Sequence, residues 1–237
     1  MEKPWTGIEK DSFLLGVDTT TPTGSAALLR GSKLVAEINQ DSPTTFSERL
    51  LPAIQFLLKS NDLALQDVKG YAVAVGPGSF TGIRIGMSTI KSFSFSSGMP
   101  IAPVSTLEAL ARKIQPREDR LICPILDAKK NEVYAALFQA KAEGLSEIIP
   151  QGAYSPDALF SRLPGRRVIH FIGSGVDVHR SALFQYFKDK ARFPKRTPYI
   201  AYEVGLIGYE ILRRGAGKDM HGIEPLYLRR SQAEEKH

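Results

Sequence analysis

The stretch VGPGSFTGIRIG, residues 75–86, has the residue types of a phosphate-binding loop that leads into a helix. Gly76 and Gly78 flank a proline and predict a sharp turn, and Ser79 is placed to cap a helix whose first N–H groups would suit an anion. The Walker pattern also requires a lysine and a Ser or Thr after the last glycine, and this sequence lacks them. Because a tight backbone path also needs glycine, the motif alone is a weak functional signal.

The turn after the apolar segment FLLGVD is a second candidate for anion binding. Asp18 and Thr19, followed by another threonine, could hold metal-nucleotide phosphates, as in a small-molecule kinase or ATPase. Alternatively, Asp18 caps the strand end and organises the turn. No glycine adjoins Asp18 to let a phosphate approach the backbone, which favours the structural role.

Other catalytic groups are sparse. The histidines at positions 170, 179, 221 and 237 show no metal-ligand spacing, and no local Ser-His-Asp set is present. Cys123, the single cysteine, lies in the apolar run LICPIL and is predicted to be a buried small hydrophobe. A chain with one cysteine forms no internal disulfide, which fits a cytoplasmic location.

The composition is that of a globular protein. The chain has 237 residues, 43% hydrophobic and 24% charged, and no apolar run approaches the roughly 20 residues that span a bilayer. The first residues lack the apolar core of a signal peptide, so we expect no membrane association. The net charge of +6 permits contact with polyanions, and much of the excess lies in the second half, in PGRR, FPKR, LRRG and YLRR. A solvated basic face is the default interpretation, and proximity to nucleic acid is the alternative.

The sequence contains an internal repeat. FLLGVD and GSAALL predict a β-hairpin, KLVAEIN a third strand, FSERLLPAIQFLL a helix, and KGYAVAVG a buried strand. PILDAKKNEVYAALF begins the same pattern again, because Asp18 and Asp127 each precede an Ala-Ala-Leu triplet by offsets of 8, 9 and 10. VAVGPG and HFIGSG form a second match in the same order. We therefore predict an α/β fold of duplicated actin-like or Hsp70-like ATPase (ribonuclease H-like) type, with two lobes and mixed sheets.

The predicted lobes are residues 1–110 and residues 111–237. The first lobe carries two helices, over 46–58 and 80–97, that are predicted to bind a partner. VSTLEALARKIQ, residues 104–115, is predicted to be the helix that leads from one lobe to the other. The boundary falls in this region because Pro116 and REDR interrupt the apolar pattern.

Two predicted helices have unusually little polar surface. The helix over 80–97 has one arc of apolar residues, a broad arc of small residues, and only two charged residues, Arg84 and Lys91. The helix over 46–58 has an apolar arc of about 160°, wider than the stripe of about 100° that faces a core. Such surface indicates either a partner or burial within a thick α/β layer.

Six segments together resemble the TsaB family, also called YeaZ: LLGVDTTTPTGSAALL, SERLLPAI, VAVGPGSFTGIRIGMSTIKSFS, PIAPVSTLEALA, ILDAKKNEVYAALF and PLYLRR. They follow in order from about Phe13 to Arg230. The resemblance implies an actin-like fold and a role in making threonylcarbamoyladenosine in tRNA, at the adenosine beside the anticodon. It also implies a non-catalytic subunit that binds the catalytic paralogue TsaD together with the ATPase TsaE.

The resemblance also bears on catalysis. The catalytic paralogue has Val-Asn-His-x-Glu-x-His where this chain has VSTLEAL, so its two metal-binding histidines correspond to Thr106 and Leu110. Leu110 cannot ligate a metal, and Thr106 is a poor ligand beside imidazole. We therefore expect no catalytic residue, no metal site and no peptidase activity in this chain.

The two apolar helices are predicted to form the interface with TsaD or, without it, with a second copy in a homodimer. No cofactor is expected to be required by this chain, although ATP or ADP could bind at the interface of the complex. Transfer RNA is expected to bind through the complex, and YLRRSQAEEKH suggests direct contact as a further possibility. Gly86→Trp is expected to block helix approach if this face lies outside the core. The predicted interface residues are Phe46, Arg49, Leu50, Leu51, Ile54, Gly82, Arg84, Gly86, Met87, Thr89 and Lys91.

Overall fold

The computed structural model describes residues 7–41, 45–115, 117–142 and 144–229, and the chain divides into two compact units. Of the described residues, the first unit comprises 7–106 and Tyr199–Leu226, and the second comprises Leu107–Pro198 and 227–229. This differs from the predicted lobes in two ways. The division precedes the predicted boundary by four residues, and Tyr199–Leu226 returns to the first unit although it was assigned to the second.

The first unit is built on a five-stranded mixed sheet of order β3-β2-β1-β4-β5. β1 pairs antiparallel with β2 and parallel with β4, so the predicted hairpin and buried strand lie side by side in the centre. The predicted third strand, β3, pairs with β2 at one edge. The strands are β1 (Phe13–Asp18), β2 (Gly24–Arg30), β3 (Lys33–Gln40), β4 (Val68–Gly76) and β5 (Ile101–Ser105).

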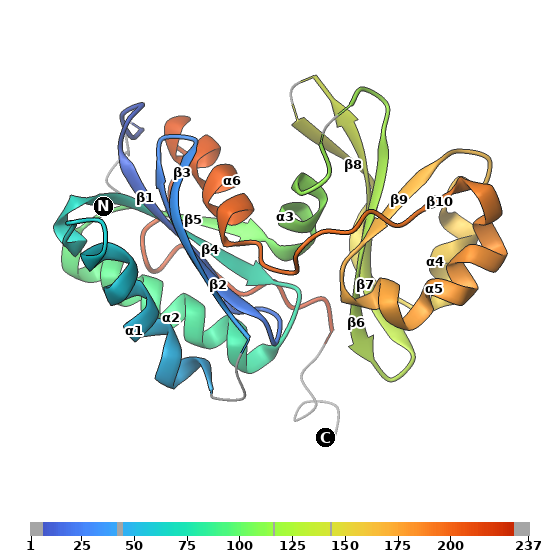
Figure 1. Ribbon diagram of the computed structural model, residues 1–237, viewed down its shortest axis with the longest axis horizontal. Helices are drawn as coiled ribbons and strands as arrows, with labels where there is room; N and C mark the ends of the chain where they lie inside the picture. Colours follow the sequence, from blue (N-terminus) through green and yellow to red (C-terminus); the bar gives the residue numbers. More distant parts are fainter. Residues whose placement is uncertain (1–6, 42–44, 116, 143, 230–237) are drawn as a thin grey trace. The chain divides into compact units, whose positions relative to one another are not determined.

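Helices cover both faces of this sheet. α1 (Phe46–Lys59) and α2 (Phe80–Ser97) pack on one face, and α6 (Ala201–Arg213) packs on the other (Figure 1). As predicted, Ser79 caps α2, since its side chain accepts a hydrogen bond from Gly82 N at 3.2 Å.

Glycine explains why α6 joins the first unit. A Cβ on Gly16 of β1 would lie 2.4 Å from the Ala201 carbonyl oxygen and 2.9 Å from Gly205 Cα. The helix backbone therefore approaches the sheet more closely than a side chain at position 16 would allow. Nothing in the order of elements along the chain indicates which sheet a helix covers, and this is why the predicted lobes were wrong for α6.

The second unit repeats the first. Its sheet has the order β10-β9-β6-β7-β8, which, read from β8, matches the first sheet strand for strand. β6 pairs antiparallel with β7 and parallel with β9, as β1 does with β2 and β4. The predicted duplication is therefore confirmed. The strands are β6 (Leu121–Lys129), β7 (Glu132–Lys141), β8 (Gly144–Tyr154), β9 (Ile169–Ile172) and β10 (Ala191–Arg192).

The helices complete the repeat. α4 (Pro156–Arg162) and α5 (Ser174–Phe187) follow β8 and β9, as α1 and α2 follow β3 and β4. α3 (Thr106–Arg112) is shorter than the predicted helix over 104–115, because Val104 and Ser105 pair with β4 as part of β5. No helix among the described residues is long and apolar enough to cross a membrane.

Candidate partner-binding site

The acid at the end of β1 organises the turn that follows it. Asp18, Thr19 and Thr20 are buried, and Asp18 Oδ1 accepts hydrogen bonds from Thr20 N at 2.9 Å and from Thr20 Oγ1 at 2.6 Å. This is the turn-forming role expected for an aspartate at such a position. Burial of both side chains favours the structural role of Asp18, and phosphate binding by Asp18 and Thr19 stays a prediction.

The turn after β1 also packs against the glycine loop that precedes α2. Ser79 N donates to the Thr20 carbonyl oxygen at 2.7 Å, and a Cβ on Gly78 would lie 2.2 Å from that oxygen. A Cβ on Gly76 would meet the Leu226 carbonyl oxygen at 2.6 Å. The chain's own backbone therefore lies against both glycines and already bonds the Ser79 N–H, which disfavours an anion here, and the site at Gly76, Gly78 and Ser79 stays a prediction.

Two glycines of α2 face inward. Cβ atoms on Gly82 and Gly86 would lie 1.9 Å from the Thr19 carbonyl oxygen and 2.4 Å from Thr19 Oγ1, respectively. Thr19 Oγ1 also donates to the Gly82 carbonyl oxygen at 2.7 Å. These glycines admit the β1–β2 turn, so their predicted contact with a partner helix is wrong. Gly86→Trp would disrupt the fold and cannot test an interface.

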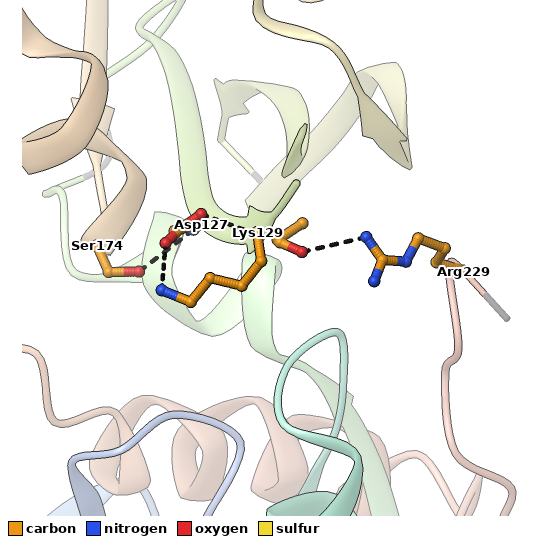
Figure 2. A network of polar contacts seen from close by, with 5 residues as sticks. Asp127, Lys129, Ser174 and Arg229 are labelled. Carbon is orange, nitrogen blue, oxygen red and sulfur yellow. Dashed lines mark hydrogen bonds and ion pairs between the residues drawn. The ribbon is translucent and has the colours of Figure 1, made fainter. Parts of the chain in front are cut away.

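The corresponding turn of the second unit is more exposed. Asp127 accepts hydrogen bonds from Lys129 N at 2.9 Å and from Lys129 Nζ at 2.7 Å (Figure 2). The hydrogen bond from the Lys129 side chain lowers the pKa of Asp127, with burial opposing it. Arg229 pairs with Glu132 at 3.1 Å and donates to the Ala128 carbonyl oxygen at 3.3 Å. Most of the predicted C-terminal basic segment, from Arg230 on, lies outside the described residues.

A groove of about 570 Å³ lies between α1 and α2 on the outer side of the first unit. Its walls are apolar side chains, small hydroxyl side chains and a single charged residue, Arg84. Leu51 on its rim is 44% exposed. We call this the α1–α2 groove, and it is lined by Phe46, Ser47, Leu50, Leu51, Thr81, Arg84, Ile85, Ser88, Thr89, Ser92 and Phe93.

Five of the predicted interface residues line this groove: Phe46, Leu50, Leu51, Arg84 and Thr89. That they contact a partner stays a prediction.

The other six predicted residues do not line it. Ile54 and Met87 are buried in the core, as are the inward-facing glycines, so their predicted partner contact is corrected. Arg49 is also buried, with its guanidinium 4.1 Å from the Phe46 ring centroid and Nη2 donating to the Pro22 carbonyl oxygen at 3.0 Å. Lys91 is half-buried.

Sequence reasoning missed part of the lining. Ile85, Ser88, Ser92 and Phe93 lie on α2, where Ser88 and Ser92 belong to the predicted arc of small residues. The arc is divided in the structure, because its glycines face the core whereas Ser88 and Ser92 face the groove. Helical periodicity identifies such an arc without showing which part of it faces outward.

The two positions that would carry metal ligands in a catalytic relative are buried. Thr106 Oγ1 donates to Thr20 Oγ1 at 3.2 Å, and Leu110 is 4% exposed. Among the residues described, no cluster of three His, Cys, Asp or Glu side chains comes together.

The remaining candidate nucleophile and base are structural. Cys123 is fully buried, and burial strongly raises the pKa of its thiol, as expected for a small hydrophobe. His170 is half-buried on β9, and burial, followed by the charge of Arg120, lowers its pKa.

Comparisons with known proteins agree with these features. Residues 40–237 match the family model described as TsaD: tRNA N6-adenosine threonylcarbamoyltransferase. The chain is 34% identical over 226 residues to the tRNA threonylcarbamoyladenosine biosynthesis protein TsaB of Bacillus subtilis (strain 168), covering 94% of this chain and 96% of that protein. It is 30% identical over 228 residues to the Haemophilus influenzae protein of the same name, covering 91% and 93%.

Among solved structures, YeaZ from Pseudomonas aeruginosa aligns with a TM-score of 0.75 and 26% identity, over 92% of this chain and 100% of that chain. Together with the repeated sheet order, this confirms the predicted duplicated actin-like α/β fold.

Proposed function

Because the chain belongs to the TsaB family of tRNA threonylcarbamoyladenosine biosynthesis proteins, we propose that it is a non-catalytic subunit required for threonylcarbamoyl transfer to tRNA. In this proposal the chain binds the catalytic paralogue TsaD and works together with the ATPase TsaE. The acceptor is the adenosine beside the anticodon.

The burial of Thr106 and Leu110 carries this proposal. Metal-dependent transfer needs ligands that face an open coordination position. Here one position holds a hydroxyl already bonded to Thr20, and the other holds an apolar side chain in the core. A TsaD-like chain altered in this way can contribute binding surface without contributing the metal centre.

The α1–α2 groove is the surface that we assign to TsaD. Exposed apolar side chains beside small residues allow a partner helix to pack closely and bury its own apolar face. Leu51 and Phe93 supply apolar contact, while Ser88 and Ser92 leave space between them. Without TsaD, a second copy of this chain would cover the same groove and form a homodimer.

No nucleotide site is assigned to the first unit's glycine loop, because backbone atoms occupy it. ATP or ADP would then bind where TsaD and this chain meet, with TsaD supplying the phosphate contacts. The proposal therefore requires no cofactor for this chain alone.

Reconstitution tests the proposed role. Unmodified tRNA and threonylcarbamoyl-adenylate are supplied to this protein alone, to TsaD with TsaE, and to all three. We expect product only with all three, and product from this protein alone would contradict the non-catalytic assignment.

A substitution at the groove tests the assigned surface. Ser88 is exposed and lines the α1–α2 groove, so Ser88→Trp should fill the groove without disturbing the core. We expect TsaD binding to weaken at least about tenfold, or about 1.4 kcal/mol. Ser96→Trp, an exposed position of the same helix outside the groove lining, is the matched control. Equal TsaD affinity for the two variants would refute the assignment of this surface.

A further inference from the structure

The positive charge of the chain is concentrated in one segment of the second unit. Residues 162–196 contain nine Lys or Arg residues and two Asp residues, a net charge of +7, whereas the whole chain carries +6. The segment comprises the end of α4, β9, α5, β10 and the chain that follows β10. The rest of the protein is therefore almost neutral.

Most of these cations are not neutralised by acids. Lys190 pairs with Asp189 at 2.8 Å, and within the described part of the chain this is the one ion pair formed by the nine. Arg192 donates to the Asp189 carbonyl oxygen at 2.6 Å, and Arg167 to the Asp119 carbonyl oxygen at 2.7 Å. Carbonyl groups orient a guanidinium but leave its charge, so the segment keeps a strong positive field.

A groove of about 500 Å³ lies within this segment, between α5 and the chain around β10. We call it the α5–β10 groove, and its lining is Arg180, Ser181, Phe184, Gln185, Ala191 and Phe193.

The groove presents aromatic rings to solvent. Phe184 is 60% exposed, which is unusual for a phenylalanine without a covering partner. Phe193 is held in place because it stacks on the buried Phe171 ring at 5.9 Å, and the Arg180 guanidinium lies 4.7 Å from its centroid.

The sheet edge beside the groove is also positive. Arg192 on β10 pairs in register with His170 on β9. Burial is the main cause of the lowered pKa of His170, and Arg120 and Arg192 lower it further. Arg192 on β10 and Arg120, the residue before β6, therefore both act on His170.

We propose that the α5–β10 groove binds tRNA directly, with an unpaired base stacking on Phe184 and with Arg180 and Arg192 contacting phosphates. Aromatic faces beside Lys and Arg side chains are the general means by which proteins bind single-stranded RNA. Ser181 and Gln185 line the same groove and supply donors and acceptors for base edges. The naming of tRNA rests on the proposed function, whereas the choice of RNA rests on the charge and the exposed rings.

The test uses the full-length protein and fluorescently labelled, unmodified tRNA, with binding followed by anisotropy over a series of salt concentrations. We expect Arg180→Glu/Arg192→Glu to weaken binding at least about tenfold at low salt and to reduce the salt slope by about two. Phe184→Ala removes one stacking platform and should weaken binding at least about fivefold with little change in slope. Lys33→Glu/Lys59→Glu, a charge reversal at exposed positions of the first unit, is the control and should lower affinity less.

Several results would overturn the inference: equal affinity of the two charge-reversed variants, no effect of Phe184→Ala, or tighter binding of a poly-glutamate peptide than of tRNA. The last result would assign the groove to an acidic protein. TsaD binding by the same variants separates this inference from the proposed function, because loss of tRNA binding with normal TsaD binding supports both. Normal tRNA binding with no TsaD binding contradicts only the proposed function.

Discussion

The helix-covered outer faces of the two repeated units have opposite chemistry. The α1–α2 groove is lined by apolar and small hydroxyl side chains with one charged residue, and the α5–β10 groove by two phenylalanines and an arginine within a segment of net charge +7. The sheets beneath them have the same strand order. Two units with the same strand order therefore present surfaces of different chemistry, and the difference lies in the side chains.

The turns that follow the first strand of each unit also differ, because one is buried and the other is partly exposed. In the first unit, the turn after β1 is buried and closes the glycine loop with its own carbonyl groups. In the second unit, the equivalent turn is held by a surface ion pair between Asp127 and Lys129. In the first unit, the buried turn packs against Gly82 and Gly86 of α2, the helix that forms one wall of the α1–α2 groove.

The largest expected effect comes from Gly82→Ala. Gly to Ala inside a helix normally stabilises by roughly 0.5–1 kcal/mol. Here the new Cβ would lie 1.9 Å from the Thr19 carbonyl oxygen, so we expect the free energy of unfolding to fall by about 3 kcal/mol. Chemical denaturation measures it. Gly165→Ala, where a Cβ would meet nothing within 4 Å, is the control, and equal stability of the two variants would show that α2 does not rest on the β1–β2 turn.

An intermediate loss of stability is expected when Asp18 is replaced, and a smaller loss when Asp127 is replaced. Asp18→Ala leaves the buried Thr20 N–H and hydroxyl without their acceptor and should lower the free energy of unfolding by about 2 kcal/mol. Asp127→Ala breaks bonds to a lysine that water can solvate, and we expect about 0.5 kcal/mol. Urea unfolding of both variants measures the difference. A larger loss for Asp127→Ala would contradict the contrast between a buried and an exposed turn.

The smallest effect concerns pH. The pKa of Asp127 is lowered chiefly by the hydrogen bond from Lys129, so its contribution to stability is present above the ordinary carboxyl pKa of 3.8. That contribution is lost as the pH falls through the depressed pKa. The stability difference between the wild type and Asp127→Asn should therefore be small at pH 7 and vanish once the pH falls below the depressed pKa. A difference that grows on acidification would contradict this assignment.

The sequence predicts the repeat well because its markers are local. Asp18 and Asp127 precede their Ala-Ala-Leu triplets by equal offsets near the ends of equivalent strands, and Gly-x-Gly follows the same strand in each unit. The hairpin registers nevertheless differ by one residue, because Asp18 pairs with Ser25 and Asp127 pairs with Val133. Packing between distant segments was not predictable in this way. The small residues of α2 suggested a partner helix, yet Gly82 and Gly86 accommodate Thr19, which lies more than 60 residues earlier in the chain.

The α5–β10 groove was also not predictable from the sequence. The positive charge of the second half is visible in the sequence, but the default interpretation of that charge was a solvated face. Phe193 lines the groove with Arg180 and Phe184 because β10, the strand before it, pairs with β9. β10 has only two residues, Ala191 and Arg192. A two-residue strand carries no periodic signal that a sequence could reveal.

We propose that the first unit binds the protein partner and that the second unit binds RNA. The most direct measurement is the affinity of Ser88→Trp and of Arg180→Glu/Arg192→Glu for both TsaD and unmodified tRNA under one set of conditions. We expect Ser88→Trp to lose TsaD binding and keep tRNA binding, and the charge-reversed variant to keep TsaD binding and lose tRNA binding. Loss of both ligands by either folded variant, or of neither by both, would contradict the division.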